Sequence, residues 1–143
     1  MIDAGKPISV FGNGSSGRDY TFVDDTVPGI IASLDYDCQF DVFNLGNSSP
    51  VTLRTLIATI EEALGNRAEI RWLPDQPGDV LITYSNIGKA QRLLGYAPKV
   101  GLREVVGRLV PWHRRTTHAA WLGSRRYAGG LWNIMLSITR NRQ

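Results

Sequence analysis

The chain has 143 residues, of which 43% are hydrophobic and 20% are charged. That length suits one modest domain, and the composition is ordinary for a globular protein, which argues against a mainly disordered chain. The single cysteine, Cys38, excludes an internal disulfide and indicates a reducing compartment. We expect its thiol to be buried or incidental, because the neighbouring Asp37 and Asp41 disfavour a thiolate.

The net charge of +3 is unevenly distributed along the chain. Residues 1–113 carry ten basic and all thirteen acidic residues, whereas residues 114–143 carry six arginines and no acid. A nucleic-acid-binding face would need basic residues clustered across the fold, so nucleic acid is not an expected partner. No run reaches the roughly 18 apolar residues of a membrane span, and the first residues lack the apolar core of a signal peptide, so we expect a cytoplasmic protein without a membrane span.

Hydrophobic periodicity and turn residues divide the chain into short strands and helices. The expected extended segments are Ile8–Phe11, Tyr20–Val23, Phe40–Leu45 and Ile70–Leu73. The expected helices run from Asp24 to Leu34, from Thr52 to Leu64, from Ser85 to Leu94 and from Leu102 to His113, with a short fifth helix over Leu131–Ile138. The pattern predicts a mixed α/β (α+β) module with four or five helices, and too few βαβ units for a complete doubly wound Rossmann sheet.

Several of these elements depend on specific end signals. Two aspartates at positions 24 and 25 suit the start of a helix, where carboxylates cap free N–H groups and favour the dipole. Ser85 is expected to cap the third helix, and Gly65 and Gly95 to end the second and third. The Phe40–Leu45 run alternates too little for a half-exposed strand, which predicts a strand buried on both faces.

No catalytic or metal-binding group stands out among the residues. His113 and His118 lack partners at metal-ligand spacing, and a histidine at the end of an apolar helix is more often a surface or capping residue. Ser15 and Ser16 have no neighbouring base, so we interpret them as turn serines. We therefore expect no metal site.

Glycines at 12, 14 and 17 match the spacing of the dinucleotide-binding fingerprint. That fingerprint must lie between a strand and a helix, and the residues after Gly17 are typical of extended chain instead. We interpret the segment as a plain loop.

Arg18 follows this flexible loop directly. A planar guanidinium pairs with phosphate oxygens two at a time, so Arg18 is a candidate phosphate clamp. Asp19 offers the other interpretation, an exposed ion pair of little energetic value. The chemistry of the residues alone leaves both open.

Ordered motifs give the chain a family resemblance. They are Gly5–Gly12, Arg18–Asp25, Phe43–Val51, Gln76–Val80, Leu93–Pro98 and the closing helix to Arg114. Together they resemble the carboxyl-terminal, substrate-binding portion of the extended short-chain dehydrogenases/reductases. Within that family they resemble the NAD-dependent nucleotide-sugar epimerases and dehydratases. The residues of these motifs are most similar to those of UDP-glucuronate 4-epimerases. The resemblance spans roughly residues 2–114, so we expect a nucleotide-sugar-binding lobe over 1–114 and a basic, aromatic-rich tail over 115–143.

The resemblance implies a UDP-sugar site on this lobe. The matching residues are Ser9, Phe11, Arg18, Asn44, Gln76 and Asp79. In such a site Ser9 and Phe11 contact the base, Arg18 pairs with the diphosphate, which favours the phosphate clamp, and Asp79 meets a ribose hydroxyl. Asn44 helps to shape the same wall. Many relatives have a second diphosphate-binding arginine where this chain has Gln76, which donates a hydrogen bond but carries no charge.

Two features of the intact family are missing from the sequence. The family binds NAD on a glycine-rich turn and uses a tyrosine with a lysine four residues later. None of the five tyrosines here has a lysine at that spacing. Hydride chemistry belongs to the cofactor, so we expect no catalytic residue, no cofactor bound by this chain alone and no activity by itself.

Three classes of function remain open from the sequence. The first is a truncated epimerase or dehydratase completed by a separate Rossmann-domain chain. The second is a non-catalytic UDP-sugar-binding or assembly module, and the third is a decayed gene product without a ligand. The tail could cover the surface that once faced the Rossmann half, pair two chains as a homodimer, touch anionic lipid or be a disordered extension.

Overall fold

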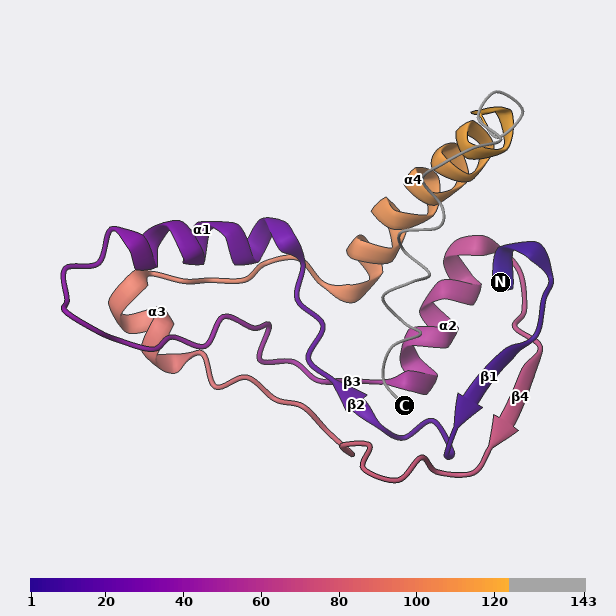
Figure 1. The fold of residues 1–143 in the computed structure, drawn as a ribbon, viewed down its shortest axis with the longest axis horizontal. Coiled ribbons are helices and arrows are strands. Elements are labelled where there is room, and N and C mark those ends of the chain that lie inside the picture. Colours follow the sequence, from indigo (N-terminus) through magenta and orange to yellow (C-terminus); the bar gives the residue numbers. More distant parts are fainter. Residues whose placement is uncertain (124–143) are drawn as a thin grey trace, which may run out of the picture. The chain divides into compact units, whose positions relative to one another are not determined.

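The computed structural model describes residues 1–123, with side chains described up to residue 116. Its elements are a 3-10 turn η1 (Ile2–Ala4), strands β1 (Ile8–Phe11), β2 (Gly17–Arg18), β3 (Val51–Thr52) and β4 (Ile70–Leu73), and helices α1 (Val23–Leu34), α2 (Leu53–Leu64), α3 (Gly88–Leu94) and α4 (Leu102–Gly123) (Figure 1). This confirms the expected mixed α/β fold of helices and short strands. The described residues form two sheets of two strands each and no doubly wound sheet.

The chain divides into two compact units, residues 1–108 and a second unit that begins at Leu109. All candidate site residues lie in the first unit. The expected lobe boundary at residues 114/115 stays a prediction, and the short helix expected over Leu131–Ile138 lies outside the described residues.

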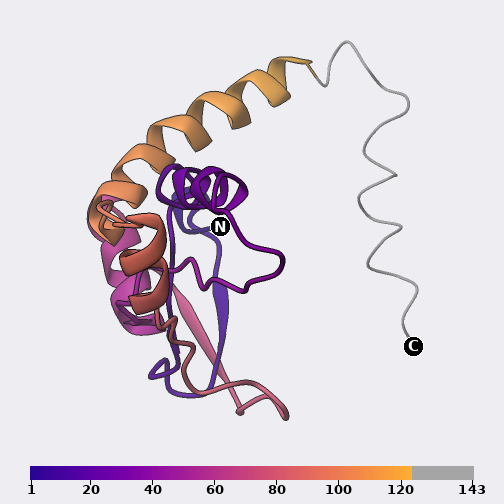
Figure 2. The same ribbon diagram turned by 90° about the vertical axis from the view of Figure 1, so that its left-hand side faces the viewer.

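Two short sheets bring distant parts of the first unit together. β1 and β4 run parallel, with Ile8 opposite Ile70 and Phe11 opposite Leu73, and the two arrows lie side by side in Figures 1 and 2. β2 pairs antiparallel with β3, and Gly17 also forms an isolated bridge with Ile82. As a result Arg18 lies in a strand fixed by segments from two other parts of the chain.

The predicted strands Ile8–Phe11 and Ile70–Leu73 and the predicted helix to Leu64 are confirmed. Thr52 caps α2, because its side chain accepts a hydrogen bond from the Thr55 backbone N–H at 3.2 Å. Gly65 ends the helix in the left-handed conformation, as expected. Local signals therefore account for α2 completely.

A small core lies between α1, α3 and the loops beside them. Ile87, Ala90 and Tyr96 are buried, and Phe43, Leu45 and Leu94 pack against them. The Tyr96 hydroxyl donates to the Gly46 carbonyl at 2.9 Å, so the polar end of this buried ring has a partner. This core fixes the loop that follows residue 45.

Of the expected extended segments, Phe40–Leu45 is wrong as a strand, and Tyr20–Val23 is extended at Phe22 but lies outside both sheets, with Val23 already in α1. Residues 20–22 have no strand pairing, and the short strand lies earlier, at Gly17–Arg18, where β3 is available as its partner. Residues 40–45 form no strand either. Among residues 1–123 no backbone–backbone hydrogen bond joins 40–45 to another segment, so the ladder that a buried strand needs is missing.

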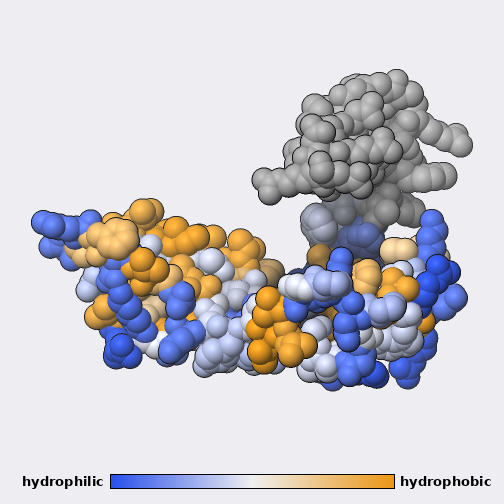
Figure 3. Space-filling model, turned by 60° about the horizontal axis from the view of Figure 1, so that its bottom comes forward, coloured by the Kyte–Doolittle hydropathy of each residue, from blue (hydrophilic) through white to orange (hydrophobic). Residues whose placement is uncertain are grey.

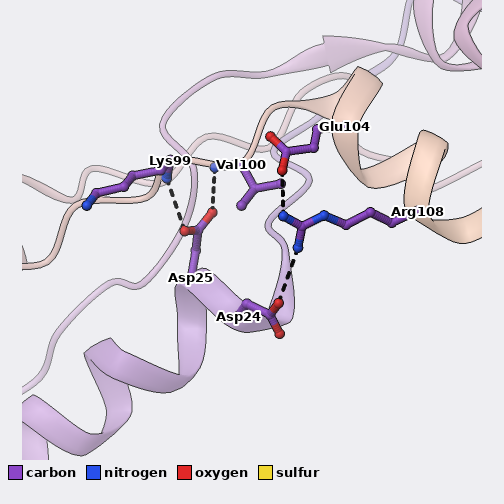
Figure 4. A network of polar contacts seen from close by, with 6 residues as sticks. All are labelled: Asp24, Asp25, Lys99, Val100, Glu104 and Arg108. Carbon is purple, nitrogen blue, oxygen red and sulfur yellow. Dashed lines mark hydrogen bonds and ion pairs between the residues drawn. The ribbon is translucent and has the colours of Figure 1, made fainter.

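The starts of two helices also differ from expectation. α1 begins at Val23, and its N-cap residue Phe22 makes no side-chain cap bond. The Asp25 carboxylate instead accepts from the backbone N–H groups of Lys99 and Val100, at 3.1 and 2.9 Å (Figure 4). Asp25 thus ties α1 to the loop before α4, although carboxylates in a first turn still favour the helix dipole.

Arg108 adds a second link at the same place. It bridges Asp24 of α1, at 3.4 Å, and Glu104 of its own helix, at 2.5 Å, as Figure 4 shows. Both aspartates at the start of α1 therefore serve tertiary contacts.

α3 begins at Gly88, three residues after the expected cap Ser85. The Ser85 N–H donates to the Asp19 carboxylate, and the Asn86 side chain accepts from the Gly88 N–H at 3.1 Å. α4 continues to Gly123, beyond the expected end at His113. No helix-ending glycine intervenes, and the Thr116 hydroxyl donates within the helix to the Trp112 and His113 carbonyls.

Candidate functional site

Arg18 is held in place by three oxygen atoms. One guanidinium nitrogen, Nη1, donates to the carbonyls of Gly17 and Val80, at 2.8 and 2.6 Å. The other, Nη2, contacts the Asp79 carboxylate at 2.6 Å. The expected alternative, a pair with Asp19, is not formed: Asp79, sixty-one residues away in sequence, is the partner. Arg18 thus links β2 to the loop of residues 74–80.

Beside this pair lies a small cavity between the end of β1 and the same loop. Its volume is about 80 Å³, and it is lined by Phe11, Asn13, Gly14, Ser15, Ser16, Asp75, Gln76, Asp79, Val80 and Leu81. Ligand pockets for drug-sized molecules span roughly 300 to 1,000 Å³, so this space accommodates part of a nucleotide rather than a whole one. The structure brings together Phe11, Gln76 and Asp79, three of the predicted residues.

The glycine loop on one wall of this cavity is anchored to α2. The Arg54 side chain donates from Nε to the Asn13 carbonyl at 2.6 Å, and its guanidinium lies 5.0 Å from the centre of the Trp72 ring. The Arg54 backbone N–H donates to the Gly14 carbonyl. Strand β2 follows this loop, so the dinucleotide fingerprint interpretation fails for want of a helix, as expected.

Asp19 is a structural centre that the sequence did not reveal. Its carboxylate accepts from three backbone N–H groups, those of Ser48 and Ser49 at 3.0 Å and that of Ser85 at 3.1 Å. Its own N–H donates to the Thr83 hydroxyl. Asp19 therefore holds the 46–49 loop and the segment at Ser85 close to Arg18, the residue that precedes it. The signal in the sequence is weak: an acid beside two serine-rich turns far away along the chain.

Ser9 and Asn44 are not among the cavity's lining residues. Ser9 lies on the exposed side of β1, as Phe11 does, while Val10 between them is buried. The Asn44 amide donates to the Asn86 carbonyl at 3.3 Å, beside the start of α3. The roles expected for both residues stay predictions.

Other reactive groups lie away from this cavity. Cys38 is exposed, not buried. Asp41 contacts Lys89, and the hydrogen bond from Lys89 together with that from the Val42 N–H holds the pKa of the Asp41 carboxyl below its usual value. Among the described residues no group of three or more metal-binding side chains gathers. The described helices include none that is both long and apolar enough to cross a membrane.

The arrangement is the Arg18–Asp79 ion pair beside a small cavity lined by an aromatic ring and by hydroxyl, amide and carboxylate side chains. Such a combination suits an anionic ligand with an attached ring system. The fold around this cavity is of the mixed α/β class.

The GDP-mannose 4,6 dehydratase family matches residues 1–109. The chain therefore belongs to this family of NAD-dependent nucleotide-sugar epimerases and dehydratases, within the extended short-chain dehydrogenases/reductases. It is 44% identical over 108 residues to an uncharacterized protein of Methanocaldococcus jannaschii, with 76% of this chain and 33% of that protein covered. It is 34% identical over 110 residues to a UDP-glucuronate 4-epimerase of Thermodesulfobacterium geofontis, with 76% and 34% covered.

Solved structures agree with the sequence comparison. A UDP-glucose 4-epimerase of Thermotoga maritima, solved with UDP-glucose, superposes with a TM-score of 0.76 at 31% identity, covering 81% of this chain and 37% of that one. A UDP-glucuronic acid 4-epimerase of Bacillus cereus, solved with UDP-glucuronic acid and NAD, gives a TM-score of 0.68 at 31% identity, covering 72% and 33%. The chain thus spans about a third of the length of the relatives it matches.

Proposed function

We propose that this chain is the UDP-sugar-binding lobe of a nucleotide-sugar epimerase or dehydratase and that it has no catalytic activity by itself. The observation that carries the proposal is Arg18, held by β2 beside a cavity that contains Phe11, Gln76 and Asp79. In the proposed complex Arg18 binds the diphosphate and Phe11 contacts the base. Asp79 binds a ribose hydroxyl.

Two facts support a UDP-sugar over other anions. The relatives include UDP-glucuronate 4-epimerases, and the similar solved structures hold UDP-glucose or UDP-glucuronic acid. The cavity is also lined by amide, carboxylate and aromatic side chains, which are the kinds of group that contact a nucleotide. Its small volume fits a lobe that supplies only one wall of the site.

The absence of catalysis follows from the chemistry of the family. The sequence has no tyrosine with a lysine four residues later, and the glycine-rich loop at residues 12–17 leads into β2 rather than into a helix. NAD, which similar structures contain, would have to be held by another part of the enzyme. In the proposed arrangement a Rossmann portion supplies NAD and the catalytic pair, and this lobe supplies the substrate contacts. A cytoplasmic location stays part of the proposal.

Calorimetric titration of the whole chain with UDP and UDP-glucuronate tests the binding claim. Arg18→Ala should weaken UDP by about 1.5 to 3 kcal/mol, because a charge-assisted, two-pronged contact is lost. Arg67→Ala is the matched control, since it removes the same charge from an arginine whose side chain is 91% exposed and which lies in the loop between α2 and β4. Equal affinity of the two variants for UDP would mean that the site lies elsewhere.

Failure of the wild-type chain to bind UDP at millimolar concentration would favour a decayed or purely structural product. Incubation with NAD and UDP-glucuronate tests the second claim. We expect no epimerised product from the chain alone, and turnover would contradict the proposed division of labour.

A further inference from the structure

The glycine loop of residues 12–17 is attached to the start of α2 by the backbone of that helix. The first N–H groups of a helix have no partner within it. Here the Leu53 N–H donates to the Ser16 carbonyl at 2.9 Å, and the Arg54 N–H donates to the Gly14 carbonyl at 3.0 Å. Any residue other than proline would make the same two bonds, so they fix the place of the loop but not the orientation of every peptide in it.

The side chain of Arg54 adds a contact that depends on its own chemistry. Its Nε donates to the Asn13 carbonyl at 2.6 Å, and its guanidinium lies 5.0 Å from the centre of the Trp72 ring, whose face attracts a cation. The stem of the side chain packs directly on the loop, because a methyl group on Gly14 would lie 2.8 Å from Arg54 Cγ. Arg54 thus holds the carbonyl of the Asn13–Gly14 peptide from the side of α2.

The Asn13–Gly14 peptide therefore has a fixed direction. The C=O and N–H of a trans peptide point in opposite directions, and this peptide is trans. Since the carbonyl is turned toward Arg54, the Gly14 N–H points away from that side chain. Gly14 is buried and lines the cavity, and its N–H has no hydrogen-bond partner among residues 1–116. Buried backbone N–H groups nearly always have a partner, so this donor is left for a molecule that occupies the cavity.

We propose that the backbone N–H of Gly14 binds the nucleoside part of the ligand, and that Arg54 is the positioning residue that directs this N–H into the cavity. The inference rests on the proposed function, which places a UDP-sugar at this site. Arg54 acts through the peptide, because it is not among the residues that line the cavity. When the Arg54 contact is lost, the Asn13–Gly14 peptide can rotate. A carbonyl oxygen in place of the N–H would repel the acceptor oxygens of a nucleoside.

The position of Gly14 favours the nucleoside over the diphosphate. The cavity that Gly14 lines also contains Phe11, the proposed contact of the base, whereas Arg18, the proposed contact of the diphosphate, is not among its lining residues. Uracil has carbonyl oxygens, which accept a hydrogen bond from a backbone N–H. In Figure 3 the right-hand end of the first unit, which contains α2, β1 and β4, is mainly hydrophilic, as suits a site for a polar ligand.

Calorimetric titration of the whole chain with UDP and with inorganic pyrophosphate tests the role of Arg54. Arg54→Met keeps an unbranched stem against Gly14 and Trp72 and removes the donor and the charge. We expect it to weaken UDP binding about three- to tenfold, the usual effect of one hydrogen bond, and to change the affinity for pyrophosphate by less than about twofold. Pyrophosphate needs only Arg18, whose strand β2 is held by its pairing with β3.

Arg54→Lys and Arg67→Met are the matched variants. Lysine carries a charged donor on a long stem that reaches the Asn13 carbonyl and the Trp72 ring, so Arg54→Lys should restore the UDP affinity to within about twofold of the wild-type value. Arg67→Met removes the same charge from an exposed arginine in the loop between α2 and β4 and should leave both affinities unchanged. Both backbone bonds from α2 to the glycine loop remain in every variant, so all should unfold near the wild-type midpoint in urea.

Nuclear magnetic resonance of the wild-type chain tests the Gly14 donor without any substitution. An amide proton that becomes hydrogen-bonded shifts downfield. With saturating UDP the Gly14 amide proton should move downfield, whereas with pyrophosphate it should stay in place. A role of Arg54 in stability alone would not produce this difference between the two ligands.

Each outcome decides the inference. A Gly14 amide proton that UDP leaves in place would overturn the proposed donor. Equal UDP affinities of Arg54→Met and Arg67→Met, or equal losses for UDP and pyrophosphate in Arg54→Met, would overturn the role of Arg54 in nucleoside binding. If Arg18→Ala weakens UDP binding and Arg54→Met does not, this inference fails while the proposed function stands. A wild-type chain that does not bind UDP would overturn the proposed function, and with it the ligand assigned to Gly14.

Discussion

Arg18 and Asp79, both expected to contact a ligand, contact each other, with Nη2 and Oδ1 2.6 Å apart. Their side chains are 31% and 49% exposed, so water reaches the pair and weakens it. A diphosphate that binds Arg18 must compete with the Asp79 carboxylate for the same nitrogen. The cost of breaking the Arg18–Asp79 pair therefore lowers the affinity with which Arg18 binds an anion.

Asp79→Asn tests this competition with inorganic pyrophosphate, which has no ribose. The variant keeps the size of the side chain and removes its charge, so pyrophosphate should bind Arg18 about three- to tenfold more tightly than in the wild-type chain. UDP should gain less, because the proposed ribose contact is weakened at the same time. Calorimetry with both ligands measures the difference, and an unchanged or lower affinity for pyrophosphate would show that the two residues do not compete.

Asp19→Asn should destabilise the first unit through its loops. The variant loses the charge that three backbone N–H groups share, and an amide nitrogen would face at least one of those donors. We expect a loss of about 2 to 3 kcal/mol in the free energy of unfolding, measured by urea denaturation. Asp35→Asn, at the exposed end of α1, is the control and should change stability by less than about 0.5 kcal/mol. Equal losses of stability in the two variants would show that the hydrogen bonds of Asp19 do not stabilise these loops.

The elements that were predicted correctly carry their signals within themselves. α2 has an apolar stripe, a capping threonine and a terminal glycine, and β1 is a short apolar run before a glycine loop. Each of these signals involves residues that are close in sequence, so it can be recognised without knowledge of the fold. The same holds for Gly95, which ends α3 as expected.

The errors arise where distant groups compete with local signals. Ser85 has the chemistry of a helix cap, yet α3 begins three residues later, and the Ser85 backbone is instead tied by its N–H to Asp19, sixty-six residues earlier. Asp25 suits a cap but binds the Lys99–Val100 backbone. Phe40–Leu45 has the composition of a buried strand, but a strand also requires a partner, and composition does not reveal whether one is present. Arg18 is a further case: its partner Asp79 lies sixty-one residues away, and no rule of sequence spacing connects the two residues.

Gly29→Ala probes the close approach of α1 to its core. A methyl group at this position would lie within 3 Å of Tyr96 and Leu45, both of which are packed in place. We expect a loss of about 1 to 3 kcal/mol in the free energy of unfolding, since overpacking moves backbone or ring. Gly107→Ala in α4 is the matched control: nothing lies within 4 Å of its added methyl, so the better helix propensity of alanine should stabilise the chain by roughly 0.5 to 1 kcal/mol. Effects of the same sign at both positions would contradict the packing argument.

Tyr96 gives the fold a pH dependence at alkaline pH. Burial raises the pKa of its hydroxyl above the ordinary value of 10.0, and the charges of Asp25 and Asp19 add to the shift. As pH rises, the unfolded chain therefore loses this proton first, while the folded chain still holds it. The stability that Tyr96 contributes is fully present below about pH 10 and is lost as the pH rises through the higher folded-state pKa.

Tyr96→Phe separates this titration from that of the other basic groups. At neutral pH the variant should be less stable by about 1 to 2 kcal/mol, because the buried Gly46 carbonyl loses its donor. Between about pH 9 and pH 11 its stability should fall less steeply than that of the wild-type chain, since phenylalanine does not ionise and the remaining groups are shared by both proteins. Urea denaturation at a series of pH values measures the two slopes. Parallel curves would mean that Tyr96 titrates alike in both states, so that its hydroxyl is not held away from water by the core that supports the Gly46 loop.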